Sequence, residues 1–174
     1  MICFSVKSNN NLKKIKIIKN FGLGADVVSK GELLRALKAG IKPQKIVFSG
    51  VGKTPDEISF AIQKKILLIN AESENELKII QKIAYKKKKK IDVGLRLNPN
   101  IDAKTLRKIS TGRNEDKFGI SDKSFVKLLK KFHNSKNINI KCLSVHIGSQ
   151  ILDYRPYSKM VSVIDNIIKK TKYK

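Results

Sequence analysis

The chain has 174 residues, of which 38 are Lys or Arg and 14 are Asp or Glu, and its formal net charge is +24. This length suits a single domain, and a hydrophobic content of 41% allows a buried core and excludes disorder throughout the chain. No apolar run approaches the roughly 18 residues of a membrane-spanning helix, which excludes a membrane-embedded protein.

Short apolar, β-branched segments alternate with amphipathic helical patterns along the whole sequence. The segments predicted to be strands are 2–6, 24–28, 45–48, 66–69, 91–97 and 139–147. The segments predicted to be helices are 10–20, 30–39, 55–63, 73–84, 121–132 and 156–170, and Ser29, Thr54, Ser73 and Ser121 stand where helix caps are expected. The first four strands recur about every 21 residues, which leaves space for one crossover helix each. We therefore expect βαβ units and a parallel sheet.

An open doubly wound sheet and a barrel both fit six β/α units, and the alternation within the strands favours the barrel. In three of the strands, one face is apolar, whereas the other carries small or polar side chains that end in a large functional group. These second faces are Cys3, Ser5 and Lys7; Asp92, Gly94 and Arg96; and Cys142, Ser144 and His146. A barrel lumen with space for a ligand has this pattern. A complete (β/α)8 barrel has eight strands and about 250 residues, so we expect an incomplete TIM-type barrel that is a fragment of a longer protein.

The strong positive charge is a weak indication of function. The Lys residues are spread along the chain, and the densest run, 86–90, falls between a predicted helix and a predicted strand, where a solvated loop is expected. With five Arg residues and no interleaving of aromatic and basic side chains, we expect no specific nucleic-acid partner, only some non-specific affinity for polyanions. The first residues lack a secretory signal, and Cys3 and Cys142 offer no disulfide framework, so we expect a cytoplasmic protein.

The segment 50–54, Gly-Val-Gly-Lys-Thr, resembles the end of a phosphate-binding P-loop. The full motif requires a glycine five residues before Gly52, and that position is Val47, inside a predicted strand. We therefore expect a tight turn between the third strand and its helix, with Thr54 as the helix cap.

The candidate site follows from the position of polar side chains. In β/α barrels, catalytic groups lie at the carboxyl ends of the strands. Those ends carry Lys7, Asp26 to Ser29, Ser49-Gly50, Asn70, Arg96 with Asn98, and His146 to Ser149. An amine, a carboxylate, a guanidinium, an imidazole and a Gly-Ser turn are thus expected at one mouth.

Each of these residues also has a simpler interpretation. An amine withdrawn from water at the end of the first strand would be free to attack a carbonyl, but Lys7 also fits an ordinary strand-end lysine. His146 fits a core imidazole, whereas Arg96, inside a strand, needs a buried partner. The remaining alternatives are a structural ion pair for Asp26, a first-turn helix charge for Glu32, and the cap of the last helix for Ser149.

Six segments resemble the diaminopimelate decarboxylases, pyridoxal-phosphate enzymes of the alanine racemase-like barrel group. They are 4–9 (FSVKSN, where the family usually reads Tyr-Ala-x-Lys-Ala-Asn), 22–33 (GLGADVVSKGEL), 46–58 (IVFSGVGKTPDEI), 95–99 (LRLNP), 110–120 (STGRNEDKFGI) and 146–150 (HIGSQ). The matches span essentially the whole chain, and KFGI after an STG turn, together with HIGSQ, favours this family over its ornithine and arginine relatives. Ser5 and Ser8 replace the usual alanines.

By that resemblance the cofactor is pyridoxal 5'-phosphate, and Lys7 is the Schiff-base lysine that holds it. The resemblance also implies that Lys7 and His146 are catalytic and that no metal is required. The implied cofactor contacts are Asp26 and Glu32 at acidic positions near the cofactor, Arg96 beneath the ring, His146 stacked on the ring, and Ser149 on the phosphate side. Lys117 lies in the matching KFG segment.

The activity that the resemblance implies is decarboxylation of a small amino acid, meso-2,6-diaminopimelate, to L-lysine, the last step of lysine biosynthesis. Family members continue with a Gly-rich phosphate loop, an acidic partner for the pyridine nitrogen and a C-terminal β-domain that reaches the active site across a homodimer interface. None of these follows residue 174. We therefore expect residues 1–174 to be a partial cofactor-binding barrel domain that is inactive, or nearly so, by itself.

Two further interpretations stay open at this point. One is another barrel enzyme that uses the same cofactor, either an ornithine- or arginine-type decarboxylase or a racemase. The other is a non-catalytic remnant that binds the cofactor or polyanions without turnover.

Overall fold

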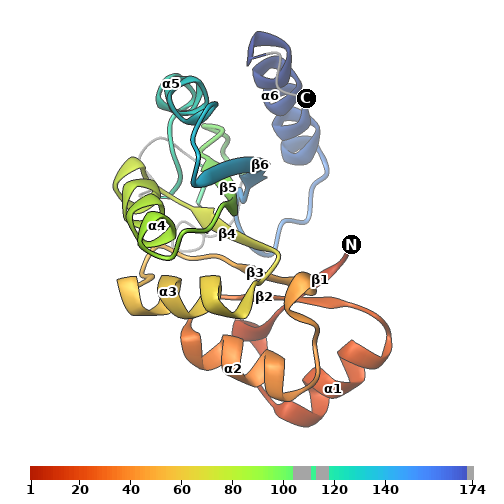
Figure 1. The fold of residues 1–174 in the computed structure, drawn as a ribbon. Coiled ribbons are helices and arrows are strands. Elements are labelled where there is room, and N and C mark those ends of the chain that lie inside the picture. Colours follow the sequence, from red (N-terminus) through yellow and green to blue (C-terminus); the bar gives the residue numbers. More distant parts are fainter. Residues whose placement is uncertain (104–110, 113–117, 172–174) are drawn as a thin grey trace.

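A computed structural model describes residues 1–103, 111–112 and 118–171, and Figure 1 shows its fold. Within these residues the strands are β1 (Cys3–Ser5), β2 (Gly24–Val27), β3 (Ile46–Phe48), β4 (Leu68–Ala71), β5 (Ile91–Leu97) and β6 (Ile138–Val145). The helices are α1 (Leu12–Asn20), α2 (Lys30–Lys38), α3 (Pro55–Lys64), α4 (Glu74–Lys86), α5 (Asp122–Phe132) and α6 (Arg155–Thr171), with short 3-10 turns η1 (Val6–Ser8) and η2 (Pro43–Lys45). The predicted alternation of strands and helices is therefore confirmed.

The described strands form one parallel sheet in the order β1-β2-β3-β4-β5-β6. A doubly wound sheet reverses its strand order at a switch point, whereas a β/α barrel adds strands in sequence order. In Figure 1 the helices follow the sheet in the same succession, from α1 and α2 at the bottom to α5 and α6 at the top. The predicted α/β class, with parallel strands in the order of a TIM-type barrel, is confirmed.

Alternate residues of the strands form the core beneath the helices. Val27 of β2, Phe48 of β3 and Leu95 of β5 are fully buried, as are most of the apolar side chains that α2, α3 and α4 turn toward the sheet. Asp26 and Arg96 occupy the opposite face of their strands and are half-buried. The polar face expected for a barrel lumen is therefore present.

Three of the four predicted helix caps form. The Ser29 and Ser73 hydroxyls accept the backbone N–H groups of the third residues of α2 and α4, and Thr54 forms a reciprocal capping box with Glu57 at the start of α3. Ser121 precedes α5 but makes no side-chain cap, because its hydroxyl donates to Ser124 Oγ at 3.2 Å.

The segment 50–54 is a turn into α3, as expected. Gly50 has a φ of +96°, a conformation that L side chains rarely adopt, and Thr54 caps the helix. Nothing in this turn presents the Lys53 ammonium to a phosphate, because the side chain is fully buried and its donors are used within the protein.

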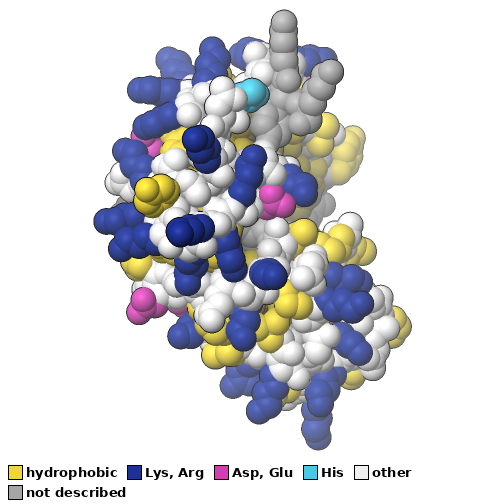
Figure 2. Space-filling model, in the orientation of Figure 1, with side chains coloured by type: hydrophobic (Ala, Val, Ile, Leu, Met, Phe, Trp, Pro, Cys, Tyr) yellow, Lys and Arg dark blue, Asp and Glu magenta, His cyan; other side chains and the backbone are white. Residues whose placement is uncertain are grey.

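The charge distribution agrees with the sequence analysis. Figure 2 shows Lys and Arg side chains scattered over the visible face, with few carboxylates between them and no gathering in one groove. Among the described residues no helix is long and apolar enough to cross a membrane.

Candidate active site

A cavity of about 720 Å³ opens at the carboxyl ends of the strands. Its volume is within the roughly 300–1,000 Å³ that is typical of small-molecule sites. Residues at or just after the ends of all six strands line it, together with Thr111 and Phe118. The predicted site residues that line it are Lys7, Asp26, Arg96, His146 and Ser149. The convergence that the strand ends predicted is therefore present.

Lys7 lies on the rim of the cavity, but its surroundings differ from those predicted. The first strand ends at Ser5, and the chain turns at once into η1, so Lys7 is in a 3-10 turn and not on the strand. Its side chain is exposed, so of the two interpretations of Lys7 the amine withdrawn from water is not the one observed. Val6 is fully buried and holds the turn against the core, which fixes the position of the Lys7 backbone.

Three side chains at neighbouring strand ends form a hydrogen-bonded chain. Asn70 Nδ2 donates to Ser49 Oγ at 3.0 Å, and Ser49 Oγ donates to Asp26 Oδ1 at 2.6 Å. The carboxylate of Asp26 is therefore held in place at the cavity wall. Asn70 Oδ1 is buried and has no partner among the described residues.

The buried partner that the sequence required for Arg96 is Glu72, at the end of β4. Arg96 Nη1 donates to Glu72 Oε2 at 2.8 Å, and the guanidinium lies over the Phe118 ring, 5.2 Å from its centroid. The other carboxylate oxygen, Glu72 Oε1, accepts the N–H of Gly50 at 2.9 Å. Arg96 Nη2 is buried and unpartnered among the described residues, so a donor remains for a ligand.

His146 follows β6 directly and is exposed at the open side of the cavity, so it is not a core imidazole. Partial desolvation of the ring lowers its pKa below the ordinary value, and the positive charges of Arg96 and Lys7 lower it further, against smaller opposing effects of Asp26 and Glu72. These effects favour the neutral form of the imidazole. Thr111 Oγ1 donates to the His146 carbonyl at 2.8 Å, which ties this position to the segment that follows β5.

Two predicted residues have different positions. Glu32 does not line the cavity, because its Oε2 accepts the N–H of Val28 at 2.9 Å and Val28 is the lining residue. Ser149 lines the cavity and is exposed, and it does not cap the last helix, which begins six residues later at Arg155. Lys117 lies outside the described residues.

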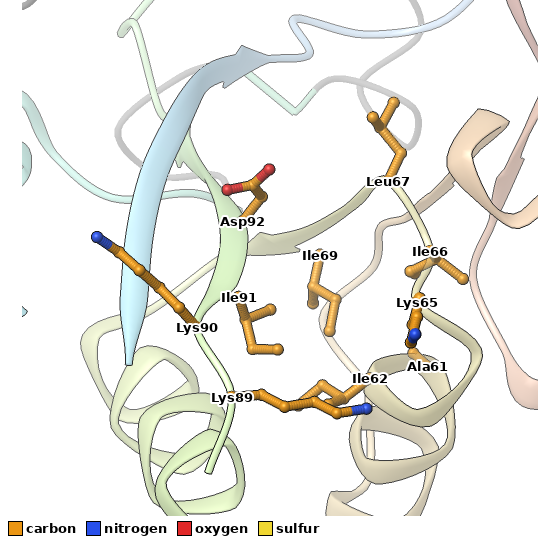
Figure 3. A pocket seen from close by; sticks show the side chains of 10 residues that line it. All are labelled: Ala61, Ile62, Lys65, Ile66, Leu67, Ile69, Lys89, Lys90, Ile91 and Asp92. Carbon is orange, nitrogen blue, oxygen red and sulfur yellow. The ribbon is translucent and has the colours of Figure 1, made fainter. Parts of the chain in front are cut away.

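A second cavity, of about 390 Å³, lies at the amino ends of β4 and β5 (Figure 3). Its lining is mainly aliphatic, with Lys65, Lys89 and Lys90 and the carboxylate of Asp92. Residues at this end of a β/α barrel usually contribute to stability and not to chemistry. The cavity at the carboxyl ends is therefore the candidate active site.

Comparison with known proteins identifies the class that this fold and site define. Residues 1–174 match the family described as pyridoxal-dependent decarboxylase, pyridoxal binding domain, and the chain belongs to that family. Among solved structures, diaminopimelate decarboxylase from Helicobacter pylori complexed with L-lysine has a TM-score of 0.96 and 44% identity, covering 98% of this chain and 43% of that one. Diaminopimelate decarboxylase from M. jannaschii in co-complex with L-lysine has a TM-score of 0.90 and 34% identity, covering 99% of this chain and 40% of that one.

Curated relatives carry the same name. Diaminopimelate decarboxylase of Helicobacter pylori (strain J99) is 46% identical over 169 residues, and that of Aquifex aeolicus is 41% identical over 174 residues. The alignments cover 97% and 98% of this chain but 42% and 41% of the relatives, so the chain spans less than half of their length. An arginine decarboxylase from Paramecium bursaria Chlorella virus, 21% identical with a TM-score of 0.81, shares the fold.

The residues present fit pyridoxal 5'-phosphate. The cavity has the volume of a small-molecule site, and it brings an amine, a neutral imidazole and a Gly-Ser turn to one mouth. Two buried polar atoms on its wall, Asn70 Oδ1 and Arg96 Nη2, have no partner among the described residues. A polar, aromatic ligand with acceptor and donor groups would satisfy them.

Proposed function

We propose that this chain forms the cofactor-binding part of a pyridoxal-phosphate-dependent decarboxylase that converts meso-2,6-diaminopimelate to L-lysine. The observation that carries the proposal is the meeting of Lys7, Asp26, Arg96 and His146 around one cavity at the carboxyl ends of the strands. The diaminopimelate decarboxylases among its relatives, which include structures complexed with L-lysine, support this substrate class.

In this proposal, Lys7 holds the cofactor covalently, and Ser149 lies on the phosphate side. The cofactor, when bound, supplies an electron sink for the pair of electrons left when carbon dioxide departs. His146 presents a neutral ring to the aromatic ligand, since burial and the neighbouring positive charges disfavour its protonation. A charged imidazolium at this position would repel the positive charge that the pyridine nitrogen carries when protonated.

Arg96 and Asp26 provide opposite charges on the wall of the same cavity. Glu72 fixes Arg96 through Nη1, so Nη2 stays available to an acceptor atom of the ligand. Ser49 fixes Asp26, whose carboxylate is then free to interact with a positively charged group. A contribution of Glu32 remains a prediction, and in this structure it acts only through the backbone of Val28.

The assembly and location that the sequence predicted are part of the proposal. We infer that the complete protein works as a homodimer in the cytoplasm on a small amino-acid substrate. Both cysteines are free thiols, which supports a reducing compartment.

Borohydride trapping tests the cofactor assignment. The protein is mixed with pyridoxal 5'-phosphate, reduced with borohydride and digested, and the modified lysine is located by mass spectrometry. Lys7 is expected to carry the label, and Lys7→Ala is expected to remove it, whereas Lys14→Ala, a change at an exposed lysine of α1, leaves it intact. Equal labelling of many lysines, unchanged by Lys7→Ala, would refute the assignment.

Substrate choice is tested on the loaded protein. Addition of meso-diaminopimelate is expected to change the absorption of the bound cofactor at lower concentration than ornithine or arginine does. A stronger response to ornithine or arginine would instead favour the related decarboxylases, and a cofactor spectrum that none of the three changes would favour a remnant that binds without turnover.

A further inference from the structure

Lys53 is a buried lysine that the candidate chemistry does not use. It lies in the turn between β3 and α3, and its side chain is fully buried. Its ammonium donates to Gly50 O at 2.5 Å, to Asn70 O at 2.7 Å and to Glu76 Oε1 at 2.7 Å, so all three of its N–H groups have acceptors. The Phe48 ring lies 5.7 Å away on another side.

These contacts join three parts of the chain near the cavity. Gly50 belongs to the turn after β3, Asn70 to β4, and Glu76 to the first turn of α4. Neither Lys53 nor Glu76 is among the residues that line the cavity, whereas Gly50 and Asn70 are. The lysine therefore lies directly behind the cavity wall.

A continuous set of contacts leads from Lys53 to Arg96. Glu76 accepts from Lys53 through Oε1 and from the backbone N–H of Glu72 through Oε2, at 2.8 Å. Glu72 in turn accepts from Gly50 N and from Arg96 Nη1. The two carboxylates thus lie next to each other in this set, between one cation at each end.

The electrostatics of burial explain why this set needs all of its members. Glu72 and Glu76 are both buried and are joined through the Glu72 backbone, so each requires a positive charge to remain ionised there. Arg96 supplies one of these charges and Lys53 the other. If Lys53 is lost, Glu76 loses its counter-charge, and Arg96 becomes the nearest cation of the set for both carboxylates.

We propose that Lys53 is a positioning residue. It neutralises Glu76, so that Glu72 alone holds Arg96 and Arg96 Nη2 stays free for the ligand. Its link to cofactor binding rests on the proposed function. The P-loop-like lysine of the sequence therefore acts on the site from behind the wall, and not by contact with a phosphate.

The experiment first removes the charge of Lys53 alone and then the charges of both Lys53 and Glu76, while the size of the side chains is kept. Lys53→Met leaves Arg96 as the remaining cation of the set for two carboxylates, whereas Lys53→Met with Glu76→Gln also removes the second carboxylate, so that Glu72 again holds Arg96 alone. Lys131→Met is the matched control, because Lys131 pairs with Glu74 on the exposed side of α4 at 2.9 Å. Thermal melting identifies the temperature at which each variant is folded.

Two measurements then report on Arg96. The first is the pKa of His146 from NMR titration, which needs no cofactor. Neither Lys53 nor Glu76 is among the groups that shift this pKa, whereas Arg96 is the largest charge effect on it. In folded Lys53→Met the pKa of His146 is expected to rise toward its ordinary value as Arg96 moves toward Glu76, whereas in the folded double variant it is expected to stay at the wild-type value.

The second measurement is the affinity for pyridoxal 5'-phosphate, from absorbance and borohydride trapping. Lys53→Met is expected to bind at least about ten-fold more weakly, the scale on which supporting residues of a site act, and the double variant is expected to recover most of this affinity. The Lys131 control is expected to match the wild type in both measurements. If a wild-type protein fails to label Lys7, the proposed function fails, but the titration of His146 still decides the positioning role. An unchanged His146 pKa in folded Lys53→Met, or a raised His146 pKa in the folded double variant, would overturn the inference.

Discussion

Gly94→Ala is a sensitive test of how the lumen of the sheet is packed. Gly94 pairs with Asn70 across β5 and β4, and a Cβ added at residue 94 would lie 2.0 Å from Asn70 Oδ1 and 3.3 Å from Leu68 Cδ2. The backbone of Gly94 has no positive φ, so alanine is acceptable there in conformation and only the contact is unfavourable. Asn70 must therefore rotate, and rotation breaks its hydrogen bond to Ser49.

The magnitude follows from these terms. Insertion of a methyl group into a packed region costs about 1–3 kcal/mol, and loss of the Asn70–Ser49 hydrogen bond costs about 0.5–1.5 kcal/mol. Replacement of glycine by alanine returns about 0.4–1 kcal/mol, because the unfolded chain loses freedom. The net expectation is a loss of about 2 kcal/mol in the free energy of unfolding, or roughly 4–8 °C in Tm for a chain of this size.

The assay is a double-mutant cycle by urea denaturation and thermal melting. In an Asn70→Ala background the clashing amide is absent, so Gly94→Ala is expected to cost little there, with a coupling energy of about 1–3 kcal/mol between the two positions. Gly52→Ala is the control, because no atom lies within 4 Å of a Cβ at residue 52. The reasoning is refuted if Gly94→Ala costs the same with and without Asn70, or no more than Gly52→Ala.

Three further predictions concern the packing of Gly24 in β2 and the titration of His146. Gly24→Ala is expected to lower the free energy of unfolding by about 3 kcal/mol or more, which exceeds the loss for Gly94→Ala. The added Cβ would lie 2.2 Å from the backbone oxygen of Lys45, which cannot rotate away. Equal melting curves for wild type and variant would contradict this. The pKa of His146 is lowered in the folded state, so the unfolded state takes up a proton first as pH falls. The free energy of unfolding should therefore decrease below about pH 6.5. This part of the pH dependence should vanish in His146→Gln. Lys7→Met should raise the pKa of His146 and Asp26→Asn should lower it, as measured by NMR titration; a shift of the opposite sign in either variant would disprove the assigned charge effects.

The elements were predictable because their signals are local. The capping box at Thr54 and the hydrophobic periodicity of the helices depend on residues close in sequence, and each corresponds to an observed helix boundary. Strand ends were predicted less well. The predicted strand 66–69 corresponds to β4 at Leu68–Ala71, and the predicted strand 139–147 corresponds to β6, which ends at Val145. In β1 the apolar alternation continues through Val6, but the chain leaves the sheet after Ser5 and Val6 is buried from within a 3-10 turn. Alternation of side chains does not reveal where hydrogen bonding to the next strand stops.

The site was predictable only in part, for a related reason. Positions at strand ends identified Lys7, Asp26, Arg96 and His146, since parallel strands bring their carboxyl ends together. The same reasoning could not find Glu72, which follows β4 and reads in sequence as an ordinary charge before a helix. The need of Arg96 for a buried partner was visible in the sequence, but the identity of that partner depends on the register between β4 and β5.

The acidic residues show how a chain with a net charge of +24 can have a cavity around which the charges are matched. Only 14 side chains are acidic, yet Asp26, Glu72 and Glu76 lie at or behind the cavity wall, each with a specific partner. The lysines, by contrast, are scattered over the exposed face seen in Figure 2. An exposed lysine costs little wherever it stands, because water solvates it, whereas a buried carboxylate that loses its partner costs several kcal/mol. The composition can therefore become rich in lysine on the surface while the charges around the cavity stay matched, and the net charge carries almost no information about the ligand.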